Sequence, residues 1–357
     1  MKKSLCVLSL AACLLLTGCR SLPTPREMGD MALLRTMGVD RAGEELLVTV
    51  STGPRAKGIQ GEDQPALVLS AQRPSLSGAA LALQGLSDSH VFFGYVDQLL
   101  LGEGLARQGV IPTLDYFARD TELGLGARLW IVRGNTGENA VRSGGDQGVE
   151  GRLTTLRTDG ELGVAAISRT AGEVYSDLLE QGASYAPALA AADEKEGAAL
   201  VDGGYAVLKG DRLAGFLDGE TARGLELLAG KPSAHVLSVD LPGNPVTVRV
   251  SGAVTTCRFS RDGKLILSCR VNARLAEYGT PLTQGEWDQV QRVLEERERA
   301  RARSALDQLR SWEADCLGLG PKAALTAPGL WSALDKKWPR QFGTREPELS
   351  LWVALHD

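Results

Sequence analysis

The chain has 357 residues, with 39 lysines and arginines against 44 aspartates and glutamates, which gives a formal net charge of −5. This acidic balance argues against nucleic acid as the main partner, because nucleic-acid-binding surfaces carry an excess of basic residues. The length suffices for two or three domains, and the 42 glycines indicate many turns between short strands.

The first 19 residues, "MKKSLCVLSLAACLLLTGC", have the pattern of a lipoprotein signal. Two lysines precede an apolar run over residues 5–16, and Cys19 follows small residues. A charged start, a short apolar segment and small residues before a cleavage site are typical of secretory signals, and this run is too short to span a bilayer. We therefore predict a signal peptide over residues 1–18 and a lipidated Cys19. The alternatives are a secreted protein with an unpaired cysteine and a short buried helix.

The segment from residue 19 to residue 190 is expected to form an α/β domain. The apolar-rich stretches predict strands within 32–41, 45–53, 66–72, 93–104 and 125–134, and helices within 75–86, 103–119 and 136–144. A strand, a helical crossover and a second strand form a βαβ unit, which pairs its two strands in parallel. Residues 167–197 predict one more helix and then an alanine-rich, charged linker, so we expect the domain boundary there.

The region 191–357 is expected to hold a small middle module at about 198–235 and a larger module at about 236–357. In the middle module, two short strands would flank the turn Lys209–Arg212, and a helix would follow over 218–230. This prediction, together with the domain before it, gives a fold class of α+β or mixed α/β, with mixed sheets packed against helices.

The larger module is expected to combine a sheet with a long C-terminal helix. Thr283 and Glu286 form a capping box, which marks the start of a helix, and a helical apolar stripe continues to about Cys316. The middle of this helix, "EERERARARS" (295–304), is charged on nearly every side. We interpret it as a solvated span with charge pairs four residues apart, the alternative being a specific docking site. A shorter helix and a closing strand at 348–355 follow.

Two cysteines lie in a predicted hairpin, "AVTTCRFSRDGKLILSCRV". The apolar residues of both strands share one face only if the loop has an odd length, and a three-residue loop with Gly263 in the left-handed conformation satisfies this. Cys257 then lies opposite Leu267, and Cys269 is its diagonal neighbour at about 7 Å, too far for an easy disulfide. We expect both cysteines to be buried free thiols.

Two glycine patterns that suggest nucleotide binding fail on their spacing. In "GETARGLELLAGKPS" (219–233), five residues rather than four separate the glycines, and Pro232 follows the lysine where a phosphate-binding loop needs Ser or Thr. In "GEGLAR", at residues 102–107, the third glycine of a dinucleotide fingerprint is absent. We interpret the first as a helix that ends at Gly230, and the second as a plain turn.

No residue is predicted to be catalytic or to bind a metal or cofactor. His90, His235 and His356 each lack a nearby nucleophile motif and a metal-type partner spacing. Carboxylates are abundant, but a catalytic pair cannot be chosen from sequence because its members come from distant positions. We therefore predict a protein that is not an enzyme, whose histidines have structural or surface roles.

Five segments, in this order along the chain, resemble the Ger(x)C spore germination lipoproteins, the C subunits of nutrient germinant receptors. They are the lipobox ending at Cys19 followed by "REMGDMALLRTMGVDR", then "YVDQLLLGEGLARQGVIPTLDYFARDTELGLGARLWIVRG", "GYAVLKGDRLAGFLDGETARGLELLAGK", "ADCLGLG" and "LDKKWPRQF". The resemblance covers nearly the whole length of the chain.

This resemblance implies a three-module, non-catalytic lipoprotein without a cofactor, held by the lipid on Cys19 at the outer face of the spore inner membrane. It also implies assembly with a membrane-embedded A subunit and a transporter-like B subunit, and a role in receptor assembly and signalling during germination. The surface that meets these partners is not identified. The turn Lys209–Arg212 is a candidate because exposed loops often carry function; the alternative is an ordinary solvated turn.

A function of another class is an extracytoplasmic solute-binding lipoprotein that delivers a small ligand to a membrane transporter. Such a protein would have two similarly sized α/β lobes of repeated βα units with a ligand cleft between them. The late hairpins and the long helix after Thr283 argue against it.

Overall fold

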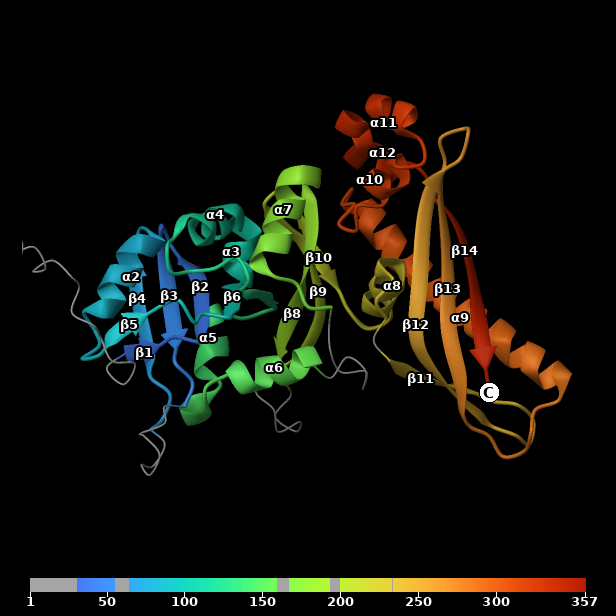
Figure 1. Ribbon diagram of the computed structural model, residues 1–357, viewed down its shortest axis with the longest axis horizontal. Helices are drawn as coiled ribbons and strands as arrows, with labels where there is room; N and C mark the ends of the chain where they lie inside the picture. Colours follow the sequence, from blue (N-terminus) through green and yellow to red (C-terminus); the bar gives the residue numbers. More distant parts are fainter. Residues whose placement is uncertain (1–30, 55–63, 159–166, 193–199, 233) are drawn as a thin grey trace, which may run out of the picture.

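The structure, a computed structural model, describes residues 31–54, 64–158, 167–192, 200–232 and 234–357. Cys19 and the predicted signal peptide lie outside these ranges. The described chain forms two lobes, each built on its own sheet, with the N-terminal lobe on the left of Figure 1 and the C-terminal lobe on the right. The predicted class, a mixed α+β fold with sheets packed against helices, is confirmed.

The N-terminal lobe contains an eight-stranded mixed sheet. Its four central strands are parallel, and an antiparallel hairpin continues the sheet at each end. In spatial order the strands are β10 (Arg212–Leu217), β9 (Leu200–Lys209), β8 (Ala183–Ala191), β7 (Arg128–Val132), β6 (Gln98–Gly102), β2 (Thr36–Ala42), β3 (Glu45–Ser51) and β4 (Val68–Arg73). The parallel pairing of β6 and β7 confirms the predicted βαβ unit.

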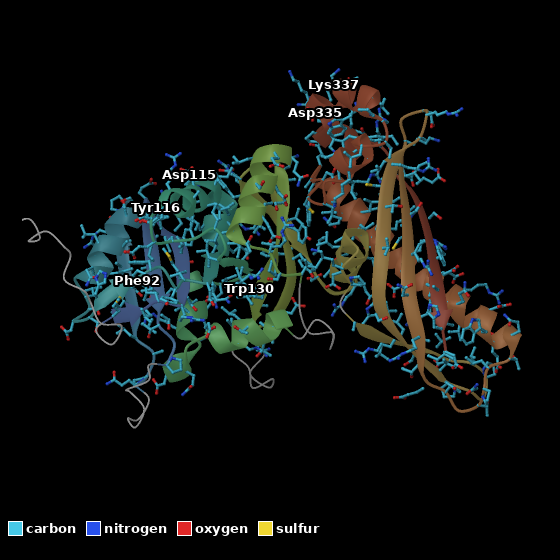
Figure 2. All side chains as sticks on the ribbon, in the orientation of Figure 1. Phe92, Asp115, Tyr116, Trp130, Asp335 and Lys337 are labelled. Carbon is cyan, nitrogen blue, oxygen red and sulfur yellow. The ribbon has the colours of Figure 1, made fainter. Side chains whose placement is uncertain are left out.

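Helices cover both faces of this sheet. Successive residues of the central strands point to opposite faces and are apolar on both, so both faces must be buried. Leu99 and Leu129 join one core, whereas Leu100 and Trp130 join the other, where Figure 2 labels Trp130. The first core receives α2 (Leu76–Gln84), α3 (Glu103–Gln108), α4 (Ile111–Arg119) and α7 (Ala171–Gln181). The second receives α5 (Gly137–Arg142) and α6 (Glu150–Thr158). A short parallel pair, β1 (Met31–Leu33) with β5 (His90–Phe92), and the 3-10 turn η2 (Gly145–Gln147) complete the lobe.

The alanine-rich stretch "ASYAPALAA" is a strand, so its interpretation as a linker is wrong. It forms β8, whose first seven residues are buried, between β7 and β9. Small side chains suit a strand that is buried on both faces of the sheet. The neighbouring residues 193–199 lie outside the described ranges.

The C-terminal lobe contains a four-stranded sheet with helices on one face. Its strands are, in spatial order, β11 (His235–Val239), β12 (Val246–Phe259), β13 (Leu265–Glu277) and β14 (Glu348–His356). The chain crosses from β13 to its parallel neighbour β14 through α9 (Gln284–Ser311), α10 (Leu319–Ala324), α11 (Pro328–Leu334), η4 (Asp335–Lys337) and α12 (Trp338–Thr344). The predicted capping box of Thr283 and Glu286 starts α9, which ends before Cys316.

The cysteine hairpin has the predicted register. Cys257 pairs with Leu267, Thr255 pairs with Cys269, and Gly263 has a φ of 79° in the connecting turn. Both cysteines are free. The expectation of free thiols in this hairpin is confirmed, although Cys257 is only partly buried.

The segment expected as a small middle module is divided between the two lobes. Its hairpin, β9 and β10, continues the large sheet, and its helix α8 (Gly219–Ala229) lies against α9 of the C-terminal lobe. Asp218 and Gly230 cap α8 as predicted. This helix therefore connects the two sheets.

Candidate interaction surface on the C-terminal sheet

One face of the C-terminal sheet is covered by helices, and the other carries basic and aromatic side chains. Along β12, β13 and β14, buried apolar residues alternate with exposed or half-buried ones, because successive side chains of a strand point to opposite sides. The side that faces away from the helical core presents the residues that we call the basic face: Arg249, Arg270, Arg274, Trp352, His356 and Val254.

The register places three of these residues in one row across the sheet. Arg249 on β12 is the direct partner of Arg274 on β13, and Arg274 is the direct partner of His356 on β14. This row therefore concentrates positive charge in a chain that is acidic as a whole.

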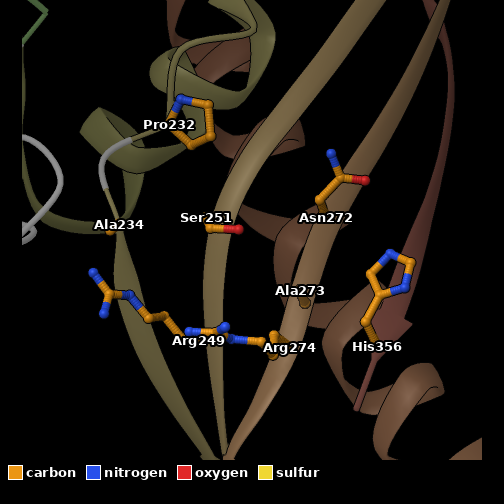
Figure 3. Close-up of a pocket in the computed structure, with 8 residues that line it drawn as sticks. All are labelled: Pro232, Ala234, Arg249, Ser251, Asn272, Ala273, Arg274 and His356. Atoms are coloured by element: carbon orange, nitrogen blue, oxygen red, sulfur yellow. The ribbon is translucent and has the colours of Figure 1, made fainter.

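A hollow of about 670 Å³ lies over this row (Figure 3). Its described lining contains two arginines and a histidine and no aspartate or glutamate: Pro232, Ala234, Arg249, Ser251, Asn272, Ala273, Arg274 and His356. Guanidinium groups, a side-chain amide and a hydroxyl are donors that suit phosphate or carboxylate oxygens. The hollow is thus suited to anions.

Apolar groups border the hollow. The guanidinium of Arg270 lies 4.7 Å from the ring centroid of Trp352, which is a cation–π contact. Trp352 remains 45% exposed, and Val236 and Val254 are each 59% exposed. An exposed cluster of this kind, together with arginines, is typical of surfaces that meet a partner.

On the opposite side of the sheet, part of the charged segment 295–304 of α9 is buried in specific contacts. Glu298 is fully buried; its Oε1 lies 3.1 Å from Nε2 of His235 and accepts a hydrogen bond of 2.7 Å from Nη1 of Arg301. Arg301 also pairs with Glu220 at the start of α8. The interpretation of this segment as a solvated span fits its exposed residues Glu296, Arg297 and Arg303 but is wrong for Glu298 and Arg301, which join α8, α9 and β11.

Further side chains of α9 bind the outer edges of the sheet. Arg299 donates to the carbonyl oxygen of Leu351 on β14 at 2.9 Å, and Arg297 donates to that of Ser238 on β11 at 3.2 Å. Edge strands expose backbone groups that invite pairing with other chains. Side chains of α9 thus engage one backbone carbonyl on each edge strand of this sheet.

The comparisons with known proteins agree on one family. The family model described as "Spore germination protein N-terminal domain" matches residues 25–190, and the one described as "Spore germination B3/ GerAC like, C-terminal" matches residues 203–350. The chain belongs to the Ger(x)C family of spore germination proteins.

Relatives of this Ger(x)C chain are found in Bacillus subtilis (strain 168). It is 24% identical over 371 residues to the putative spore germination protein YfkR, in an alignment that covers 97% of this chain and 94% of the relative. It is 22% identical over 335 residues to spore germination protein B3, with coverages of 89% and 88%. The crystal structure of the GerBC protein has the same fold, with a TM-score of 0.59 at 17% identity over 89% of this chain and 96% of that one.

The glycine pattern of the Ger(x)C helix α8 has a packing role. An added Cβ at Gly224 would overlap the carbonyl oxygen of Arg301 and lie 2.8 Å from Cβ of Ala305, both on α9. Gly230 ends α8 with a φ of 69°. Gly224 therefore lets α8 pack closely against α9, and Gly230 lets the helix end there.

The predicted candidate turn, Lys209–Arg212, is engaged within the chain. Lys209 Nζ lies 2.9 Å from Glu313 Oε2 in the C-terminal lobe, and the carbonyl oxygen of Asp211 accepts a hydrogen bond from the Val110 backbone N–H at 2.8 Å. This turn connects the lobes to each other.

Of the predicted histidines, His235 belongs to the buried cluster and His356 to the basic face, while His90 is half-buried in β5.

A second hollow, of about 560 Å³, lies beside α2, α3 and α4 of the N-terminal lobe. Figure 2 labels two of its residues, Asp115 and Tyr116. Asp115 already pairs with Arg119 and accepts from the Tyr175 hydroxyl at 3.0 Å, and burial followed by the neighbouring Asp120 raises the pKa of Tyr116 to about 12. These polar groups hold the helices to one another.

The most deeply buried titratable groups have structural partners. Asp315 accepts from the backbone N–H groups of Leu319 and Gly320 and from the indole of Trp338, at 2.7–2.8 Å. Burial raises its pKa although these donors oppose the shift. Asp40 accepts from the first two N–H groups of α5.

Within the described ranges, no group of three or more His, Cys, Asp or Glu side chains is placed to hold a metal ion, and no helix could cross a membrane.

Proposed function

We propose that this chain is the lipid-anchored C subunit of a nutrient germinant receptor, with a non-catalytic role in assembly and signalling. The proposal is supported by the succession, in one chain, of a sequence pattern that predicts a lipoprotein signal ending at Cys19 and two domains of the spore germination family over 25–190 and 203–350. The lipid on Cys19 would hold the body at the outer face of the spore inner membrane. Its partners there would be the A and B membrane subunits.

The polar groups of the interior support a non-catalytic role. Glu298, Asp315 and Asp40 each hold two or more elements together. A group that is committed to such contacts is not available for general acid or base chemistry, which requires access to a substrate. The proposal therefore attributes function to the surface rather than to an active-site cleft.

The alternative of a solute-binding lipoprotein is disfavoured by the arrangement of the two lobes. One contains an eight-stranded mixed sheet and the other a four-stranded sheet with helices on one side, whereas a solute-binding protein would present two similar lobes around a cleft. A screen of nutrients by thermal unfolding tests this alternative, since a bound ligand raises the stability.

The experiment is deletion of the gene in the spore former that encodes it, followed by complementation. We expect spores of the deletion strain to lose the response to at least one nutrient while still germinating with a trigger that acts downstream of the receptors. Complementation with the wild-type gene should restore the response, and complementation with Cys19→Ala should not. Labelling with a radioactive fatty acid should mark the wild-type chain only. An unaltered nutrient response in a strain without redundant receptors would contradict the proposal.

A further inference from the structure

The end of the N-terminal lobe that carries α2, β1 and β5 presents apolar side chains to solvent. Leu81 is 77% exposed, Leu86 is 57% exposed and Tyr95 is 45% exposed. Gln84, one helical turn after Leu81, accepts a hydrogen bond of 2.9 Å from the backbone N–H of Val91 in β5. The last turn of α2 is therefore fastened to β5, and the exposed leucines lie beside that strand.

An aromatic pair continues this surface. The rings of Phe92 and Tyr95 meet edge to face with their centroids 5.8 Å apart, and Figure 2 labels Phe92. Tyrosine is enriched where a membrane meets water, because its ring is apolar while its hydroxyl can stay hydrated. We call Leu81, Leu86, Phe92 and Tyr95 together the apolar end of the lobe.

The sequence around the apolar end carries almost no charge. Residues 74–96 contain a single Asp, Glu, Lys or Arg, which is Asp88, whereas these residues make up 23% of the whole chain. Protein partners are selected largely by complementary charged and polar groups, and this segment offers few of them. A bilayer surface instead binds exposed apolar area. The composition therefore favours lipid over a protein as the partner.

The apolar end is also where the described chain begins. β1 starts at Met31 and pairs in parallel with β5, so that Leu33 is the partner of Phe92. In the proposed function Cys19 carries the lipid, and only residues 20–30 lie between it and Met31. A chain spans at most about 3.6 Å per residue, which limits the separation between the lipid anchor and Met31 to about 40 Å. The anchor thus keeps the apolar end near the bilayer.

We propose that the apolar end docks on the lipid bilayer, with Leu81, Leu86 and Tyr95 in the headgroup layer. The inference rests on the proposed function, because the lipid on Cys19 supplies the tether. Tethering makes this second contact intramolecular, so a weak surface interaction suffices to orient the body. The apolar end and the C-terminal sheet lie at opposite ends of the longest axis in Figure 1. Docking would therefore hold the C-terminal lobe away from the bilayer.

The test replaces the lipid by a tag. The chain from residue 20 onward retains every described strand and helix, and an N-terminal histidine tag binds it to phosphatidylcholine vesicles that contain a nickel-chelating lipid. A polarity-sensitive fluorophore is attached at Leu86→Cys, in a Cys257→Ala background because Cys257 is the partly exposed native thiol. The matched control carries the fluorophore at Leu325→Cys in the C-terminal lobe, where Leu325 is 86% exposed.

We expect the emission of the fluorophore at residue 86 to shift to the blue on the vesicles and to be quenched by lipids with brominated chains. The fluorophore at residue 325 should show neither change. In the chain labelled at residue 86, the fraction quenched gives the ratio of docked to undocked molecules. High salt should alter this ratio little, because the contact is apolar and screening acts on charges.

Paired variants locate the contact. Leu81→Gln with Tyr95→Gln should lower the docked-to-undocked ratio about tenfold or more, since burial of one large apolar side chain contributes about this factor. Leu179→Gln with Tyr278→Gln removes a leucine and a tyrosine that are 61% and 44% exposed elsewhere, and should change the ratio less than about twofold. Unfolding midpoints confirm that each variant is folded.

Three results would overturn the proposal. The first is equal quenching at residues 86 and 325, or none at either, and the second is an equal loss in the two paired variants. The third is a fluorophore at residue 86 that is already shielded from water without vesicles, which would mean that the chain itself or a second copy covers the apolar end. Because the tag replaces the lipid, none of these results depends on Cys19 or on the germination phenotype of the deletion strain. Failure here is therefore distinguishable from failure of the receptor assignment.

Discussion

Oε1 of Glu298 on α9 lies 3.1 Å from Nε2 of His235 on β11, and both side chains are buried or nearly so. Arg301, one helical turn further along α9, donates to the same oxygen and also pairs with Glu220 on α8. Glu298 and Arg301 of α9 therefore join β11 through His235 and α8 through Glu220. Because α8 follows directly on the large sheet and α9 covers the small one, this cluster lies where the two lobes are joined.

Replacement of Glu298 by alanine should destabilise the protein by about 3 kcal/mol, because breaking a buried ion pair costs about 3–5 kcal/mol and Arg301 keeps Glu220 as a second partner. Urea unfolding measures the change. Glu296→Ala removes an exposed carboxylate from the same helix and should shift stability by less than about 0.5 kcal/mol. Equal effects of the two substitutions would mean that the cluster has no particular role in stability.

The pairing of Glu220 with Arg301 predicts a pH dependence. The hydrogen bond from Arg301 lowers the pKa of Glu220 below its ordinary value of 4.5. A carboxyl group with a lowered folded-state pKa contributes stability above its unfolded pKa and loses it as the pH falls through the folded value. The stability difference between wild type and Glu220→Gln should therefore be constant near neutrality and shrink below pH 4.5. Unfolding curves at several pH values measure it, and a difference that grows on acidification would contradict this assignment.

Gly224 should not tolerate a side chain, despite its position inside a helix. An added Cβ would overlap α9, and overpacking of this kind costs about 1–3 kcal/mol, more than the roughly 1 kcal/mol that alanine gains over glycine in helix propensity. Gly285→Ala is the matched control, since Gly285 lies on α9 and an added Cβ there meets nothing within 4 Å. We expect Gly224→Ala to lower the unfolding midpoint and Gly285→Ala to leave it unchanged or raise it slightly.

Local patterns predicted most of the elements, but not the way in which they assemble. The capping box at Thr283 and the register of the cysteine hairpin depend on neighbours in sequence, and both are as predicted. The strand character of β8 depends on hydrogen bonding to β7 and β9, its neighbours on either side in the sheet, so its alanines alone did not indicate a strand. The burial of Glu298 similarly depends on His235, which is 63 residues away.

The basic face was only partly visible in the sequence. The alternation Arg270, Asn272, Arg274 along β13 indicates an exposed polar side of a strand. Its pairing with Arg249 depends on an irregularity of the register between Val250 and Gly252, and a shift of one residue would move Arg249 to the other side of the sheet. No local motif specifies that irregularity.

The hydrogen bond between Trp338 and Asp315 provides the last prediction. Trp338→Phe keeps an aromatic ring in the cluster with Phe259 and Phe342 but removes one of the three donors to a buried carboxyl group. The loss should be about 1–3 kcal/mol, the cost of an unsatisfied buried polar group. Trp331→Phe, in the same aromatic cluster, removes a similar area without touching this bond and should cost less.

The pH dependence of the Trp338→Phe deficit separates the lost hydrogen bond from lost packing. Burial raises the pKa of Asp315 above 3.8 in the folded protein, whereas the indole donor lowers it, so the variant should have a still higher folded-state pKa. A carboxyl group with a raised folded-state pKa loses stability as the pH rises. The deficit of Trp338→Phe should therefore be larger at neutral pH than at acid pH, measured by urea unfolding, whereas a pure packing defect would give a deficit independent of pH.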